Sequence, residues 1–178
     1  MLMYLSAREF WGVVHGMVLG ALFLLAYGGG LAGLYSLRPD WVTPAGVRER
    51  LIRLKLGAWG MAIVAWLTVI TGTWIVYPWY RAKPPAEADL RFFPRAYLLA
   101  DPQRAGWHTF GMEWKEHVAW LAPILATAVV YVIYVYGEEL ATDSRMRTVL
   151  MVLFTLAFLA AAAAGLFGAL ITKVAPIL

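Results

Sequence analysis

Apolar residues are concentrated in four long uncharged runs, and the charged residues lie in the segments between them. The runs cover residues 10–37, 56–80, 118–137 and 148–172. A helix needs about 20 apolar residues to cross a hydrocarbon core about 30 Å thick, and each run reaches that length. The pattern predicts an all-α integral membrane protein in which residues 1–178 form a single four-helix transmembrane bundle.

The composition agrees with a membrane protein. Hydrophobic residues make up 62% of the chain and charged residues 15%, against about a quarter charged in an average soluble protein. The absence of cysteine excludes disulfides, thiolate metal sites, iron–sulfur clusters and covalently attached haem. The first run is too long for the core of a signal peptide, so we expect it to remain as the first span.

Four spans place both termini on one side of the membrane together with the loop 81–117. The loops 38–55 and 138–147 then face the other side. Five basic residues fall within the short segment 38–55, and the positive-inside rule weighs short loops most heavily. We therefore expect loops 38–55 and 138–147 to be cytoplasmic, in a bacterial or organellar inner membrane.

The segment 81–117 differs from a flexible linker because it is rich in aromatic residues. They are Phe92, Phe93, Tyr97, Trp107, Phe110 and Trp114. Aromatic side chains gather at membrane interfaces, so we expect a structured interfacial loop, with a short amphipathic stretch around residues 94–100.

Three histidines carry the candidate chemistry. His15 lies about two turns into the first span, His117 begins the third, and His108 precedes it by nine residues. Because the first and third spans run in the same direction, all three approach the same face of the membrane. Ionisable residues inside a membrane bundle are costly and usually mark a site.

Two imidazoles from different helices can clamp a haem b iron, and a four-helix bundle can build such a site in its core. This hypothesis assigns His15 and His117 as axial ligands, with His108, Met17 and Met112 as competitors. Small residues beside His15 would admit the flat macrocycle: Gly12, Gly16 and Gly20. Cations of the aromatic loop and the start of the third span could hold the propionates: Arg91, Arg95, Arg104 and Lys115.

Other interpretations of the same residues stay open. The glycines could serve only close helix packing, and His117 could be an interfacial residue. Glu113 and His117 share one helical face and, with His15 and Glu116, could bind a transition metal, form a proton relay or bind a quinol. Glu116 and Lys115 are typical of a solvated first helical turn.

The helix count, the size and the histidines near one face resemble the small four-helix transmembrane b-type cytochromes. This resemblance implies a quinol-linked electron-transfer or accessory subunit, rather than a stand-alone enzyme, within a larger respiratory or photosynthetic complex. Its partner, another membrane subunit or an electron-carrier protein, would bind on the face of loop 81–117. The alternative is a cofactor-free structural subunit that packs against its neighbours.

Overall fold

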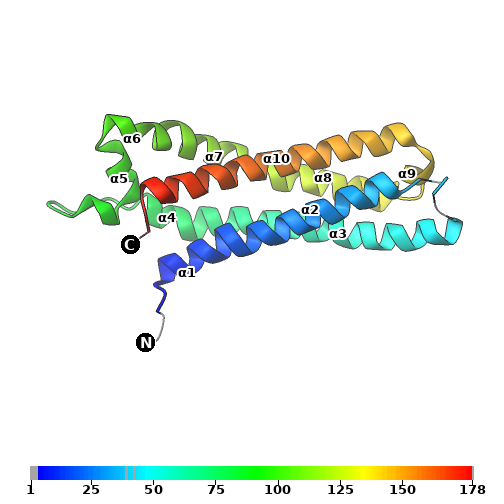
Figure 1. Cartoon of the computed structure of the whole chain (residues 1–178), viewed down its shortest axis with the longest axis horizontal. Helices are drawn as coiled ribbons and strands as arrows, with labels where there is room; N and C mark the ends of the chain where they lie inside the picture. The colour runs from blue at the N-terminus through cyan, green and yellow to red at the C-terminus, as the bar shows by residue number, and fades with distance from the viewer. Residues whose placement is uncertain (1–3, 39, 42, 178) are drawn as a thin grey trace. The chain divides into compact units, whose positions relative to one another are not determined.

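The computed structural model describes residues 4–38, 40–41 and 43–177, and its secondary structure is helical, with no strand among these residues. Four helices are long and apolar enough to cross a membrane: Ala7–Ser36, Pro44–Tyr80, Pro102–Val135 and Ser144–Val174 (Figure 1). The predicted fold class is therefore confirmed.

Three of the four long helices described here contain a π-helical turn. The first comprises α1 (Ala7–Val13), the π-helical turn η1 (Val14–Val18) and α2 (Leu19–Ser36). The second comprises α3 (Pro44–Thr71), the π-helical turn η2 (Gly72–Val76) and α4 (Tyr77–Tyr80). The third comprises α6 (Pro102–Gly106), the π-helical turn η4 (Trp107–Met112), α7 (Glu113–Val118) and α8 (Leu121–Val135), and the fourth is α10 (Ser144–Val174). Shorter elements are η3 (Leu90–Phe92), α5 (Pro94–Leu99) and α9 (Glu139–Thr142).

The third helix begins well before the apolar run that predicted it. Asp101 caps it by accepting a hydrogen bond from the Gln103 N–H, and Pro102 occupies its first turn. The helix then continues through the charged segment 113–117, so the connection to the second helix covers residues 81–101 and not 81–117. Hydropathy marks the part of a helix that suits lipid, whereas capping residues mark where the helix starts.

Contacts divide the described chain into two compact units. The histidine unit holds the described residues within 1–20, 67–120 and 162–178, and the aliphatic unit holds those within 21–66 and 121–161. All three histidines belong to the histidine unit.

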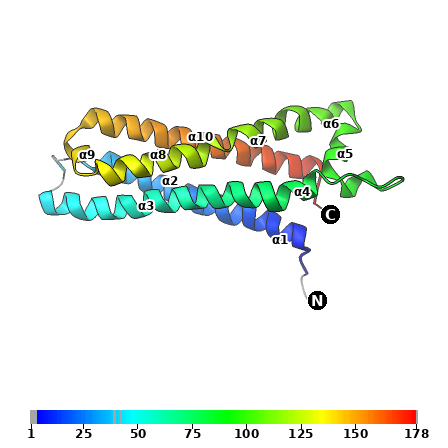
Figure 2. The same cartoon turned by 180° about the vertical axis from the view of Figure 1, so that it is seen from behind.

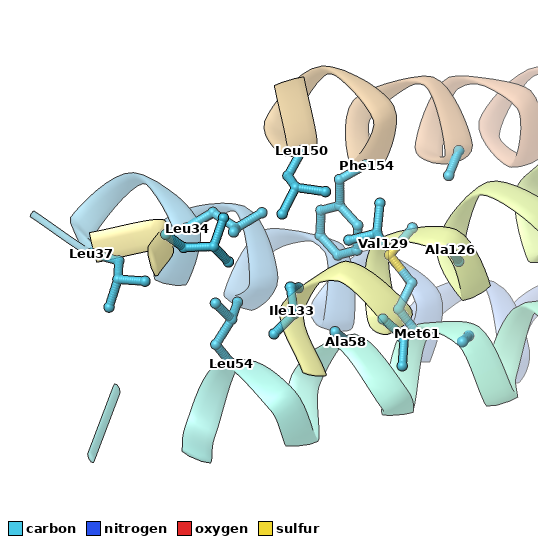
Figure 3. Packing of buried hydrophobic residues seen from close by; sticks show 14 of the residues in the cluster. Leu34, Leu37, Leu54, Ala58, Met61, Ala126, Val129, Ile133, Leu150 and Phe154 are labelled. Atoms are coloured by element: carbon cyan, nitrogen blue, oxygen red, sulfur yellow. The ribbon is translucent and has the colours of Figure 1, made fainter. Parts of the chain in front are cut away.

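The aliphatic unit packs segments of all four long helices around one core. Figure 3 shows Leu150 and Phe154 of α10 pointing toward Val129 of α8, with Met61 of α3 close by. Two polar bridges join helices beside this core. Tyr27 and Thr155 share a hydrogen bond of 3.1 Å, and the Trp66 indole donates to Thr127 over the same distance.

The histidine unit has a smaller core, formed by Tyr80, Leu98, Met112, Ile171 and Ala175. The C-terminal end of α10 lies beside α4 and α5 in both views of the chain (Figures 1 and 2). The helix α5 occupies the short stretch expected to be amphipathic around residues 94–100, and its Leu98 is fully buried.

One close approach in the aliphatic unit depends on a glycine. The ring of Phe154 lies so near Gly30 that a Cβ there would be 2.6 Å from two ring atoms. Phe154 is 1% exposed and cannot move aside without disturbing the core. Gly29, the preceding residue, has open space where its Cβ would be.

We predict that Gly30→Ala lowers the free energy of unfolding by about 1–3 kcal/mol, because it overpacks the contact with Phe154. Gly29→Ala is the matched control, and it should leave the stability unchanged or raise it by up to about 1 kcal/mol through helix propensity. Reversible unfolding in mixed micelles measures both. Equal effects of the two substitutions would contradict the packing described here.

Candidate functional site

Three π-helical turns lie in the histidine unit, and two of them contain a histidine. His15 is in η1, His108 is in η4, and η2 begins at Gly72, against which His15 packs. A π turn inserts one extra residue into a helix, and such turns are frequent at functional sites. The π-helical turns therefore lie in the same unit as the three histidines.

His15 is half-buried against the second long helix. Its Nδ1 lies 3.1 Å from the Thr71 hydroxyl oxygen, and the ring fills the space that a side chain at residue 72 would need. A Cβ on Gly72 would be 2.8 Å from the Cε1 atom of His15. Glycine at this position thus allows the imidazole to reach the Thr71 hydroxyl.

The hydrogen bonds of Thr71 favour one tautomer of His15. The Thr71 hydroxyl donates to backbone carbonyls of its own helix, at 2.8 Å from the oxygen of Leu67 and 3.2 Å from that of Thr68. Its oxygen is then the acceptor for His15, so the ring proton is on Nδ1. The lone pair of the imidazole is consequently on Nε2, the atom through which histidine commonly binds a metal.

Lys115 is a cation within electrostatic range of His15. Its ammonium rests on Gly168 of α10, where a Cβ would be 2.8 Å from the Nζ atom, and its charge acts electrostatically on the His15 ring. The interpretation of Lys115 as a residue of a solvated first turn is wrong. The residue belongs to the interior of a helix that begins at Pro102, and it packs against another helix.

His108 is 4% exposed and uses both ring nitrogens within the protein. Its Nε2 accepts a hydrogen bond of 3.2 Å from the Arg95 guanidinium, which can only donate. Its Nδ1 must then carry the proton and donate it to the Tyr80 hydroxyl at 2.9 Å. Neither nitrogen of His108 is left for a metal in this arrangement.

His117 lies on the exposed side of α7. Its Nδ1 donates to the backbone carbonyl of Glu113 over 2.6 Å, which leaves the lone pair on Nε2 directed away from that bond. The structure therefore gives His15 and His117 the same tautomer. They have no hydrogen-bond partner in common among the contacts described, so the structure does not itself join them into one site.

Two carboxylates of α7 bind side chains near the end of the second helix. Glu116 accepts a hydrogen bond of 2.6 Å from the Tyr77 hydroxyl, and Glu113 pairs with Arg81 at 3.5 Å and lies 3.8 Å from the Nε2 of His108. The Oε1 atom of Glu116 is buried, and no described residue bonds to it. Glu116 is thus part of the protein interior, and its interpretation as a solvated residue is wrong as well.

The three loop arginines are bound within the protein. Arg91 and Asp89 form an ion pair of 2.7 Å, and the guanidinium holds the pKa of the Asp89 carboxyl below its usual range. Arg104 pairs with Asp101 at 3.1 Å, and Arg95 donates to His108. Among the cations predicted to hold a propionate, Lys115 is the one whose charge acts on His15.

Two of the three glycines predicted to admit the macrocycle have open space where a Cβ would be. A Cβ at Gly16 or Gly20 would meet nothing within 4 Å, and one at Gly12 would touch Ile177 at 3.1 Å. Of the alternative sulfur ligands, Met17 is exposed and Met112 is buried in the core of the histidine unit. The glycine that makes room for His15 is Gly72, on the second helix.

Within the described part of the chain, no group of three or more histidine, aspartate or glutamate side chains is placed to hold a metal ion. Comparisons with protein-family models, curated proteins and solved structures found no match to this chain. The function must therefore be inferred from the geometry of the site.

Several residues of the site were missing from the sequence-based prediction: Thr71, Gly72, Tyr77, Tyr80 and Arg81. Periodicity within one helix cannot show which neighbouring helix will face His15 or Glu116, so the partners became visible only from the packing.

We predict that Tyr77→Phe lowers the free energy of unfolding by about 1.5–3 kcal/mol, since it removes a hydrogen bond to a carboxylate that has no other described partner. Tyr131→Phe is the matched control, because Tyr131 is 64% exposed and its change should stay within about 0.5 kcal/mol. Unfolding in mixed micelles measures both. Equal stability of the Tyr77→Phe variant and the wild type would contradict the buried pairing.

Proposed function

We propose that this chain is an integral membrane electron-transfer subunit that binds one haem b through His15, with His117 as the second axial ligand. Bound haem b would supply one-electron redox chemistry between a quinol and a partner of a larger respiratory or photosynthetic complex. The partner would bind on the face of the aromatic loop. The four apolar helices are consistent with the membrane environment that this function needs.

The observation that carries the proposal is the tautomer of His15. A ligating histidine usually donates its second ring N–H to a protein acceptor, which fixes the ring and leaves the other nitrogen for the metal. His15 does this with Thr71, and His117 does it with the carbonyl of Glu113. His108 has no free nitrogen, so the hydrogen bonding favours the other two as ligands.

The surroundings of His15 suit a propionate-bearing cofactor in one further respect. A propionate near the His15 ring needs a cation, and the ammonium of Lys115 acts electrostatically on that ring. Two imidazole Nε2 atoms and one ammonium group are the kinds of group that haem b needs from a protein.

A second candidate function is a cofactor-free structural subunit. It is favoured by Gly16 and Gly20, whose surfaces are open in this chain and would let a neighbouring helix approach closely. In that case His15 would serve only to hold the first helix against the second.

A reduced-minus-oxidised visible spectrum of the purified protein tests the haem proposal. We expect an α-band in the b-type region, with haem occupancy at least about tenfold lower in His15→Ala and in His117→Ala, as loss of a ligand implies. His108→Asn is the control, because it changes a histidine that binds only protein groups, and it should keep the band.

Gly72→Ala provides a second test that leaves all three histidines in place. The added Cβ displaces the His15 ring, so the α-band should weaken or shift, whereas Gly60→Ala has open space at its Cβ and should not alter it. A band that survives His15→Ala contradicts the ligand assignment. Absence of a band from protein purified with its native partners overturns the haem proposal and favours the structural subunit.

A further inference from the structure

A mostly apolar cleft opens in the histidine unit, away from His15. Its walls come from the end of the second helix, the segment η3–α5 and the C-terminal end of α10, which lie together in Figure 2. The principal lining residues are Trp79, Tyr80, Phe92, Pro94, Ile171 and Ile177, and its empty volume, with the open mouth included, is about 540 Å³. Arg8 is the cation among the lining residues.

One lining residue connects the cleft to the buried polar cluster. Tyr80 accepts the Nδ1–H of His108, because the Nε2 of that ring is engaged by Arg95. The hydroxyl of Tyr80 therefore keeps its own proton for a further acceptor, and no described residue takes it. A carboxylate oxygen of Glu113 lies 3.8 Å from Nε2 of His108. Glu113 also forms an ion pair with Arg81.

We infer that this cleft binds the headgroup of a lipid-soluble quinone. The aromatic walls at Trp79 and Phe92 suit a planar ring, and a quinone carbonyl would accept a hydrogen bond from the Tyr80 hydroxyl. Sites of this kind are concave and mostly apolar, with few polar groups that fix the ligand's orientation. The inference deepens the proposed function, since it names where the quinol of that function binds.

A lipid tail is the other apolar occupant that such a cleft could take. An acyl chain has no use for a hydrogen-bond donor, and it would leave the Tyr80 proton unpaired at a cost. Tyr80 is hydrogen-bonded to His108, and Glu113 lies 3.8 Å from that ring; His108 and Glu113 are both groups that can hold a proton, as the chemistry of a quinone requires and that of a lipid tail does not. These contacts favour the quinone.

Binding of decylubiquinone to the full chain in lipid nanodiscs tests the inference, with quenching of tryptophan fluorescence as the readout. Tyr80→Phe should weaken binding about fivefold, the value of one net hydrogen bond. Ile171→Phe, which fills the cleft, should weaken it at least about tenfold. The matched controls are Tyr131→Phe and Ile124→Phe, both at exposed positions, and they should bind as the wild type does.

The haem proposal and the quinone inference can fail separately. His15 does not line the cleft. The His15→Ala variant should therefore lose haem and still bind decylubiquinone with the wild-type affinity. Unchanged affinity in both Tyr80→Phe and Ile171→Phe would overturn the inference. Displacement of the quinone by n-decane as readily as by unlabelled decylubiquinone would show a site for apolar tails, and would overturn it equally.

Discussion

The hydrogen bond between His15 and Thr71 is the contact on which the functional account depends. Within membrane helices, a polar side chain that finds no partner is costly, so an imidazole must be bonded by another helix or by a ligand. The Thr71 oxygen accepts a hydrogen bond from Nδ1 of His15, and the Thr71 hydroxyl donates its own hydrogen to a backbone carbonyl of its helix. This division of donors and acceptors places the lone pair of His15 on Nε2, which would lie 3.4 Å from a Cβ on Gly72. The same reasoning separates His108, whose nitrogens are both occupied, from His117.

Close helix approach in this protein is achieved by single glycines that face one large side chain. Gly72 makes room for His15, Gly168 for Lys115, and Gly30 for Phe154. In each case the side chain comes from a different long helix than the glycine, so the pair fixes the register of two helices. The regular spacing of Gly12, Gly16 and Gly20 has no such role within the chain, since most of that surface is open.

The number and type of spanning helices could be predicted because hydropathy and length are sufficient for that purpose. The start of the third helix could not be found in this way, because residues 102–117 are polar and aromatic and their helix depends on the cap at Asp101. His15 could be recognised as a candidate from its depth in an apolar run. Its partners, Thr71 and Lys115, come from segments far away in sequence, and so do those of Glu116 and His108. Such pairings follow from packing and have no signature within one helix.

The central claim is that His15 carries its proton on Nδ1 and presents Nε2 to a ligand. Nitrogen NMR of the cofactor-free protein tests this directly, with labelled histidine and with His108→Asn and His117→Ala used to assign the three rings. The account predicts a neutral His15 with a protonated Nδ1 and an unprotonated Nε2, and loss of that pattern in Thr71→Val. A His15 ring protonated on Nε2 in the wild type would contradict it.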